Sequence, residues 1–262
     1  MHYGIMNCKK PLILVVNDDG YEAKGLEAMV SIAKSLGEVA VVVPDRTRSG
    51  MGHAITMNEP LRLINYKNED GIAYYKTNGT PVDCVKLGER VVLRDRKIDL
   101  VLSGINHGSN SSVSVIYSGT MAAAIEATFD NIPAIGLSLL DYSPHADFTA
   151  AVHFGRPIVE QVLEKGLPPY ICLNVNIPKV PVEEIKGVKI TRQCHGVWHE
   201  DLVERTDPFG RKYYWLTGCL DRHELAEDTC EWALQNHYVS VQPVQFDLTA
   251  HQYIPNLKYL EQ

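Results

Sequence analysis

Two short apolar runs, separated by a segment with helical spacing, constrain the fold of this chain more than any other feature. Residues 12–16 read Leu-Ile-Leu-Val-Val and residues 39–43 read Val-Ala-Val-Val-Val. Runs this short and this apolar are typical of strands buried on both faces of a parallel sheet. Between them, residues 25–36 repeat apolar side chains at the spacing of one helix face. The order strand, helix, strand predicts an α/β fold.

The same alternation continues to about residue 180. A helix is expected to begin after Thr80, because Thr80 suits the N-cap, Pro81 the first helical position and Asp83 the first turn. The order of elements predicts a doubly wound α/β/α sandwich, with a mainly parallel sheet and helices on both faces. Apolar patterns place further strands at 99–102, 132–140 and 170–177, and further helices at 119–129 and 148–163.

The last third of the chain has a different character. Residues 188–216 are rich in Trp, Tyr, Thr and Gly, which suggests β-hairpins. A short helix at 228–236 and a strand at 238–241 are expected to follow. Because the sequence contains no clear linker or internal repeat, we expect a single domain over 1–262. Its core would cover about 1–180 and a C-terminal elaboration about 181–262.

The C-terminal tail carries apolar side chains that have no obvious local core. An exposed apolar patch of this kind favours association with a second subunit. From the residues alone, two arrangements stay open for the segment from about 220 onward: an arm packed on another subunit, or a tail folded back on its own sheet. The apolar residues of the tail are Tyr253, Ile254, Leu257, Tyr259 and Leu260.

Charge and cysteine content argue against several function classes. The chain has 25 Lys and Arg against 32 Asp and Glu, a formal charge of −7, whereas proteins that bind nucleic-acid polymers normally present a basic face. Its six cysteines include no CxxC spacing, which argues against a zinc ribbon or a redox motif. No apolar run approaches the ~18 residues of a membrane span, and none near the start suits a signal peptide. We therefore expect a cytoplasmic protein with reduced thiols and no membrane partner.

The first candidate for chemistry is Asn17-Asp18-Asp19-Gly20, directly after the first apolar strand. Ligands bind to open parallel sheets in the crevice at the carboxyl ends of the strands. Two adjacent carboxylates at that edge repel each other and lose hydration unless a cation holds them. A solvated Asx turn is the alternative, because acidic turns are common.

Three later loops offer complementary groups. The loop 44–53 carries a hydroxyl at Ser49 and two guanidinium groups that suit phosphate oxygens, although, for this loop taken alone, a surface loop whose arginines pair with nearby acids is the favoured interpretation. The loop 103–110 offers the amide of Asn106 as a neutral oxygen ligand, or as the cap of a turn. The segment Tyr117-Ser118-Gly119-Thr120 opens an Ala-rich helix, whose free amides suit an anion, although a simple Ser N-cap explains it equally well.

Taken together, the four loops favour one kind of centre. An all-oxygen ligand set favours Mg²⁺, Mn²⁺ or Ca²⁺ over zinc. A cation of this kind beside a helix-start anion site is a plausible phosphate-cleaving centre. The sequence contains neither GxGxxG nor GxxxxGK[ST], so the dinucleotide and P-loop interpretations lose support.

Two histidine-based alternatives are weaker. His195 and His199 are four residues apart and could bind zinc from one helix face. Gly196 lies between them, however, no acid completes an HExxH motif, and the composition favours a strand. His107, next to Asn106, is an acid/base candidate that could instead pack or cap within its loop.

The ordered motifs resemble one protein family. NDDG is followed by PDRxRSGxGHAIT, TNGTPVDCV, SGINHGSN and YSGTMAAAIEA, and later by LNVNIP and YVSVQP. In this order they are similar to the SurE family, the survival-protein E 5′/3′-nucleotidases, over nearly the whole chain. The resemblance implies a Rossmann-like α/β/α sandwich with a C-terminal extension swapped between subunits of a homodimer or homotetramer. It also implies a phosphatase that acts on nucleoside monophosphates, with polyphosphate as a possible further substrate.

The resemblance also implies roles for particular residues. The family's metal ligands correspond to Asp18, Asp19, Ser49 and Asn106, with one divalent cation per subunit. The phosphate-facing helix start corresponds to Ser118, Gly119 and Thr120. Two positions depart from the family's pattern: Ala127 stands where Gly is frequent and Gln242 where Thr is usual. Neither residue is one of the proposed metal ligands.

Two mechanisms remain open at this stage. Asp18 and Asp19 can hold the cation while one of them accepts a proton from an attacking water. Alternatively, one of the two aspartates is a nucleophile that forms an aspartyl-phosphate. A haloacid-dehalogenase-like phosphatase is a competing interpretation, but that chemistry needs two acids separated by one residue. A non-catalytic nucleotide sensor would keep the phosphate site without turnover.

Overall fold

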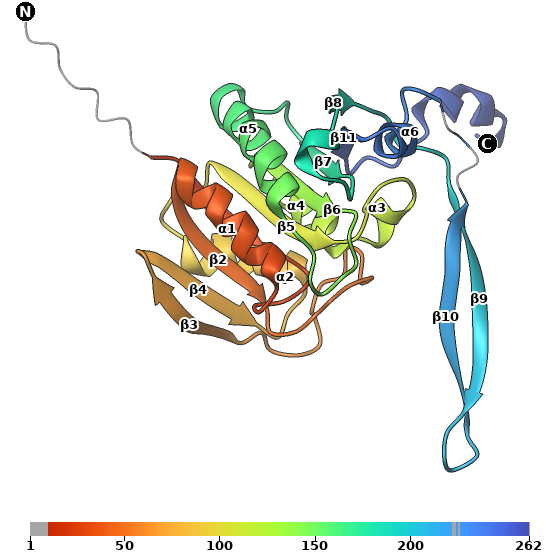
Figure 1. Cartoon of the computed structure of the whole chain (residues 1–262), viewed down its shortest axis with the longest axis horizontal. Coiled ribbons are helices and arrows are strands. Elements are labelled where there is room, and N and C mark those ends of the chain that lie inside the picture. Colours follow the sequence, from red (N-terminus) through yellow and green to blue (C-terminus); the bar gives the residue numbers. More distant parts are fainter. Residues whose placement is uncertain (1–9, 222–223, 225, 262) are drawn as a thin grey trace, which may run out of the picture.

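The computed structural model describes residues 10–221, 224 and 226–261. Its centre is a nine-stranded sheet with the strand order β3-β4-β2-β1-β5-β6-β7-β11-β8 (Figure 1). The strands from β4 to β7 in this order are parallel to one another, whereas β3 and β11 run antiparallel to their neighbours β4 and β7. The bounds are β1 Leu12–Val16, β2 Glu38–Pro44, β3 Leu63–Glu69, β4 Ile72–Thr77, β5 Leu100–His107, β6 Ala134–Leu139, β7 Ile171–Ile177, β8 Gly187–Ile190 and β11 Tyr238–Gln245.

Helices cover both faces of the sheet, as the alternating sequence predicts. Ile13 and Val15 of β1 point into the core shared with α1 and α5, whereas Leu12 and Leu14 point into the core shared with α2 and α4. Successive side chains of a strand alternate between its faces, so the unbroken apolar run of β1 fills both cores. The helices are α1 Lys24–Leu36, α2 Pro81–Leu87, α3 Ser114–Tyr117, α4 Gly119–Phe129, α5 Thr149–Lys165 and α6 Cys230–Gln235, with a π-helical turn η1 at Gly88–Val92.

The strand expected at 99–102 is longer than its apolar run. β5 continues through Ser103 and Asn106 to His107, so more than half of the expected loop 103–110 is strand. Its register against β6 shifts between Ser103 and Asn106. Gly104 has φ +120°, and a Cβ added there would lie 2.4 Å from the carbonyl oxygen of Leu137. An apolar pattern does not predict this part of the strand, because its buried residues are mostly small or polar.

The edge hairpin β3–β4 was not expected. Its two-residue turn is Asp70-Gly71, with φ values of +53° and +79°. Asp-Gly is a favoured pair for such turns because both positions need positive φ. This dipeptide is the sequence signal for the hairpin.

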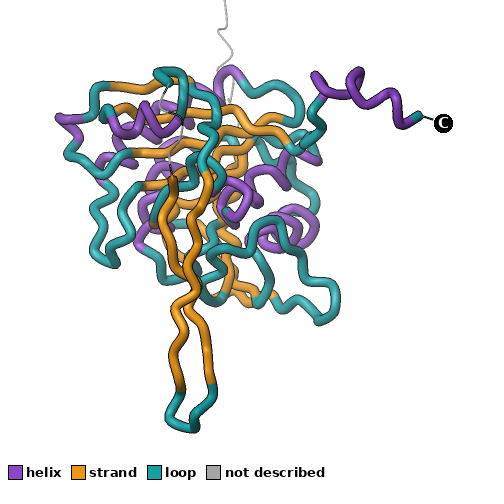
Figure 2. Tube along the Cα trace, turned by 90° about the vertical axis from the view of Figure 1, so that its right-hand side faces the viewer, coloured by secondary structure: helices purple, strands orange, loops and turns teal. Residues whose placement is uncertain are grey.

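A second hairpin projects from the body of the molecule. β9 Val197–Thr206 and β10 Lys212–Asp221 pair only with each other among the described strands. Of the hairpin region expected at 188–216, the first part instead forms β8 at the edge of the main sheet. Figures 1 and 2 show the hairpin reaching away from the sheet and its covering helices.

The C-terminal segment divides into a buried part and an exposed part. α6 and β11 belong to the body, since β11 pairs with β7 and β8 and buries Val239 and Val241. The exposed part is a 3-10 helix, η3 His251–Leu260, in which no residue is buried (Figure 2). The segment from 220 onward is therefore not a free arm as a whole. In the described part of the chain, no helix has both the length and the apolar character needed to cross a membrane.

Candidate active site

The predicted site residues gather where the strand order reverses. The chain passes from β1 to β2 on one side of the sheet and from β5 to β6 and β7 on the other. Open α/β sheets bind ligands at such a switch point, outside the carboxyl ends of the strands. Asp18 and Asp19 follow β1 here, Ser49 follows β2, and Asn106 lies near the end of β5.

Asn17 makes the turn that presents the two aspartates. Its Nδ2 donates to the carbonyl oxygen of Gly20 at 2.9 Å, and the N–H of Gly20 donates to its Oδ1 at 3.3 Å. Gly20 has φ +96° and lies against the backbone of Arg46, 3.1 Å from where a Cβ would be. An Asx turn is therefore present, but Asn17 forms it, and the carboxylates of Asp18 and Asp19 are not used for it.

Asp18 is a buried carboxylate held by helix α4. Asp18 is only 3% exposed. Its Oδ1 accepts a hydrogen bond from the hydroxyl of Thr120 at 2.6 Å. Burial, followed by the charge of Asp19, raises the pKa of Asp18 to about 6. Its carbonyl oxygen accepts the N–H of Arg48 at 2.7 Å, which ties the loop after β2 to this turn.

Asp19 is more accessible and is held from the other side. Its Oδ2 accepts the backbone N–H of His107 at 3.2 Å, and its carbonyl oxygen accepts the hydroxyl of Thr47 at 3.2 Å. Burial raises the pKa of Asp19, while the N–H and the imidazole of His107 act in the opposite direction. The ring of His107 packs edge-on against Phe148, with centroids 4.9 Å apart.

The start of α4 lies directly against Asp18. Ser118 is the N-cap and accepts the N–H of Met121 at 3.0 Å. A Cβ on Gly119 would lie 2.9 Å from the Cβ of Asp18 and 3.0 Å from its Oδ2, so only glycine allows this approach. The side chains of Ser118 and Thr120 thus serve the helix and Asp18. In the first turn, the N–H of Met121 is taken by Ser118 and the N–H of Thr120 bonds Asp18, so α4 offers an anion the N–H of Gly119 and the positive end of the helix dipole.

Ser49 lies exposed on a loop with several attachments. Gly52 donates its N–H to the carbonyl oxygen of Tyr117 at 3.0 Å, and the hydroxyl of Thr80 donates to that of Ala54 at 2.7 Å. Arg48 turns away from the anion site, since its Nη2 donates to the carbonyl oxygen of Asn78 and lies 3.8 Å from Asp45. For Arg48, the structure therefore favours pairing within the protein over phosphate binding.

Asn106 is nearly buried at the irregular end of β5. Its Nδ2 donates to the carbonyl oxygen of Gly108 at 2.8 Å. This hydrogen bond fixes the amide plane and leaves Oδ1 as the atom suited to a cation.

The histidine alternative finds no supporting cluster. His199 lies in β9, not on a helix, and its Nε2 is 2.8 Å from Asp221. Among the described residues, no group of three or more His, Cys, Asp or Glu side chains could hold a metal ion. A cation at the switch point would therefore depend on two carboxylates together with hydroxyl and amide oxygens.

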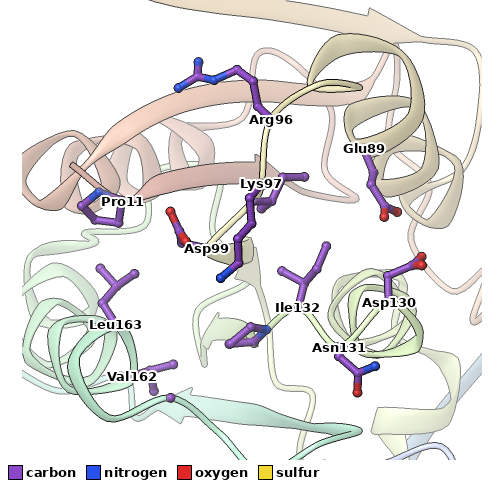
Figure 3. Close-up of a pocket in the computed structure, with 13 residues that line it drawn as sticks. Pro11, Glu89, Arg96, Lys97, Asp99, Asp130, Asn131, Ile132, Val162 and Leu163 are labelled. Atoms are coloured by element: carbon purple, nitrogen blue, oxygen red, sulfur yellow. The ribbon is translucent and has the colours of Figure 1, made fainter. Parts of the chain in front are cut away.

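A well-formed cavity lies elsewhere in the molecule. It has a volume of about 750 Å³ and lies among Pro11, Asp99 and Ile132, which precede β1, β5 and β6. Figure 3 shows these residues with Leu163 around it. Because the strands are parallel, their starts lie at the edge opposite the acidic pair.

Fold and site together define a doubly wound α/β protein with an oxygen-rich acidic centre at its switch point. Residues 13–200 match the family described as survival protein SurE, and the chain belongs to the SurE family. It is 53% identical over 248 residues to "5′-nucleotidase SurE" of Cytophaga hutchinsonii, covering 95% of this chain and 96% of that protein. It is 54% identical over 254 residues to the protein of the same name from Christiangramia forsetii, covering 96% and 97%.

A crystal structure of the SurE protein from Aquifex aeolicus resembles the whole fold. The TM-score is 0.83 at 42% sequence identity, with 96% of this chain and 100% of that chain covered. The family expected from the ordered motifs is confirmed.

Proposed function

We propose that this chain is a divalent-cation-dependent phosphomonoesterase that hydrolyses nucleoside 5′-monophosphates to nucleoside and phosphate. The observation that carries the proposal is the pair Asp18 and Asp19 at the switch point, held by Thr120 and by the N–H of His107 beside the start of α4. Relatives about 50% identical over nearly their full length bear the name 5′-nucleotidase SurE.

The residues at the switch point fit a hard cation. A buried carboxylate next to a second one is costly unless positive charge offsets it, and the raised pKa of Asp18 reflects that cost. Asp18, Asp19, Ser49 and Asn106 would hold Mg²⁺, Mn²⁺ or Ca²⁺ through oxygen atoms alone. When bound, the cation would neutralise charge on the phosphoryl oxygens.

Groups of this chain then bind the phosphate and accept the proton. The backbone N–H of Gly119 binds a phosphoryl oxygen at the positive end of α4, next to Ser118 and Thr120, and Thr120 holds Asp18 beside it. Asp19, the more accessible carboxylate, accepts a proton from the attacking water. In the competing route, the same carboxylate attacks phosphorus, the ester P–O bond breaks to release the nucleoside, and water then hydrolyses the aspartyl-phosphate to free phosphate. Acid quench of a turnover reaction with labelled substrate separates the two routes, because only the second leaves labelled phosphate on the protein.

The proposal includes three further expectations. The substrate range extends to 3′-nucleotides and polyphosphate, and the six reduced cysteines expected from the sequence suit a cytoplasmic enzyme. Residues 1–262 act as one domain that forms a homodimer or homotetramer through the elaboration after about residue 180. Exposed apolar side chains on the hairpin support this assembly, including Leu202, Phe209, Trp215 and Leu216.

A metal-by-substrate panel tests the proposal. Phosphate release is measured from 5′-AMP, 3′-AMP, ribose 5-phosphate and polyphosphate, each with Mg²⁺, Mn²⁺, Ca²⁺ or chelator. We expect turnover of 5′-AMP with at least one cation and none with chelator. Binding of 5′-AMP without release of phosphate would contradict an enzyme and favour a nucleotide sensor.

A further inference from the structure

Tyr142 is an exposed aromatic side chain beside the site, and none of the motifs above contains it. It follows β6, the strand next to β5 in the sheet. The residue is 72% exposed, yet its ring lies on the backbone of the segment that follows Asn106. One side of the ring is thus held against the protein while most of the residue faces solvent.

Gly108 makes this arrangement possible. It has φ +108°, and a Cβ added there would lie 2.2 Å from the Tyr142 ring. Any other residue at this position would push the ring away. The Tyr142 hydroxyl also accepts the N–H of Ser109 at 3.4 Å. A ring held at both its face and its hydroxyl loses little further freedom when a ligand stacks on it.

The position of the ring relative to the acidic pair suits a nucleotide. Asp18 and Asp19 follow β1, Asn106 lies near the end of the neighbouring β5, and Tyr142 follows β6, the next strand. Two strand spacings amount to about 10 Å, a span that a nucleoside can bridge when its phosphate lies at the start of α4. The acidic pair, Ser49, Asn106 and the start of α4 all offer polar contacts suited to a cation and a phosphate, and none offers a surface for a base.

We propose that Tyr142 is a specificity-determining residue that stacks on the base of the substrate and so favours nucleotides over other phosphate monoesters. This inference rests on the proposed phosphomonoesterase function. It adds the residue that contacts the base, the part of the substrate farthest from phosphorus. Aromatic stacking tolerates every base, because each presents a π-face. The stack therefore gives selectivity for nucleotides as a class, with little preference among bases.

The test compares kcat/KM for 5′-AMP with kcat/KM for ribose 5-phosphate, which has the same phosphate ester and sugar but no base. We expect Tyr142→Ala to lower the ratio of the two values about 10-fold, mainly through KM for 5′-AMP, the scale of losing one base–aromatic stack. Tyr142→Phe keeps the ring and is expected to keep the ratio within about two-fold. Tyr170→Ala is the matched control, since Tyr170 is an exposed tyrosine that precedes β7 at the opposite edge of the sheet.

Each other outcome points to a different error. Equal losses for both substrates in Tyr142→Ala would overturn the stacking role and leave the phosphomonoesterase proposal standing. A fall in the ratio for Tyr117→Ala but not for Tyr142→Ala would place the base at the other exposed tyrosine of the site and overturn the assignment. If the wild-type protein hydrolyses neither ester with any cation, the proposed function fails, and this inference fails with it.

Discussion

At the scale of single residues, the site depends on a few side chains that hold one another in place. Asp18 would be a costly group in a protein without function there, since it is buried beside a second carboxylate. Thr120 and the N–H of His107 orient the pair, while Gly119 gives α4 its close approach. These residues stabilise the buried charge of Asp18, which folding alone does not favour. A buried charge held in this way is typical of a functional centre.

The aspartates are expected to affect activity and stability in opposite ways. Asp18→Asn and Asp19→Asn should each lower turnover at least ~100-fold, the scale of losing one preorganised electrostatic contact. In chelator, Asp18→Asn should raise the melting temperature by about 2–4 °C, because the buried charge disappears while Thr120 keeps an acceptor. Steady-state kinetics and thermal denaturation at pH 8 measure the two effects. Wild-type turnover in both variants at saturating cation would refute the role given to the pair.

Gly119→Ala tests the contact between α4 and Asp18. The added methyl would lie 2.9 Å from the Cβ of Asp18, so either the helix or the aspartate must move. Because a shift of about 1 Å at a reactive centre can cost about 100-fold in rate, we expect a large fall in kcat and an unchanged circular dichroism spectrum. Ala122→Gly in the same helix is the control for altered helix propensity. Full activity in Gly119→Ala would show that this approach is not needed.

At the scale of elements, Glu126 of α4 joins three parts of the site's frame. Glu126 is 8% exposed. Its carboxylate lies 2.9 Å from Nε2 of His53, a residue of the loop that carries Ser49, and also bonds Lys86 of α2. Burial alone would raise the pKa of Glu126, but the hydrogen bonds with His53 and Lys86 outweigh it and lower the pKa. The helix proposed to bind phosphate at its start is thereby tied to the loop that carries Ser49.

Glu126→Gln should destabilise the protein in a pH-dependent way. We expect a loss of about 1.5–3 kcal/mol at pH 7, the range for a hydrogen bond to a charged group. A carboxyl whose pKa is lowered on folding contributes stability above its unfolded pKa and loses it as pH falls through the folded value. The difference between wild type and variant, measured by urea denaturation, should therefore narrow below about pH 4.5. An equal difference at pH 7 and pH 4 would indicate a packing effect instead.

Elements with one strong local signal could be predicted from the sequence, and irregular elements could not. The runs of β1 and β2 and the capping signals at Thr80 place their elements within one or two residues of the observed bounds. An apolar pattern does not predict the end of β5, because Ser103 and Gly104 are small or polar residues that only the surrounding layers bury, which is a tertiary effect. The contact between Thr120 and Asp18 joins residues 102 apart in the chain, and only the fold brings them together.

At the scale of the whole molecule, two segments remain outside the compact body. The hairpin β9–β10 and the helix η3 both present large apolar side chains to solvent. Contiguous apolar surface of this kind usually marks a protein–protein contact. The exchange of a terminal element between copies is a low-cost route to a symmetric dimer.

Removal of residues 247–262 tests the tail as an interface. All five of its apolar residues named above are exposed, with Tyr259 at 77%, so the deletion leaves the core of the subunit intact. We expect a smaller assembly by light scattering and a modest change in melting temperature. A deletion that begins near 220 would be uninformative, because it removes β11 from the main sheet. If the truncated protein forms an assembly with the same number of subunits as the full-length protein, the tail is excluded as the main interface.

The most direct test of the central claim is phosphate release from 5′-AMP by the full-length protein before chelation, after exhaustive chelation and after return of a single cation. The account predicts that activity disappears with the cation while the circular dichroism spectrum persists, because a chain of this size buries enough apolar surface to fold without metal. Activity should return with Mg²⁺ or Mn²⁺ in the wild type but not in Asp19→Asn. Full activity in protein shown by elemental analysis to contain no divalent metal would contradict it.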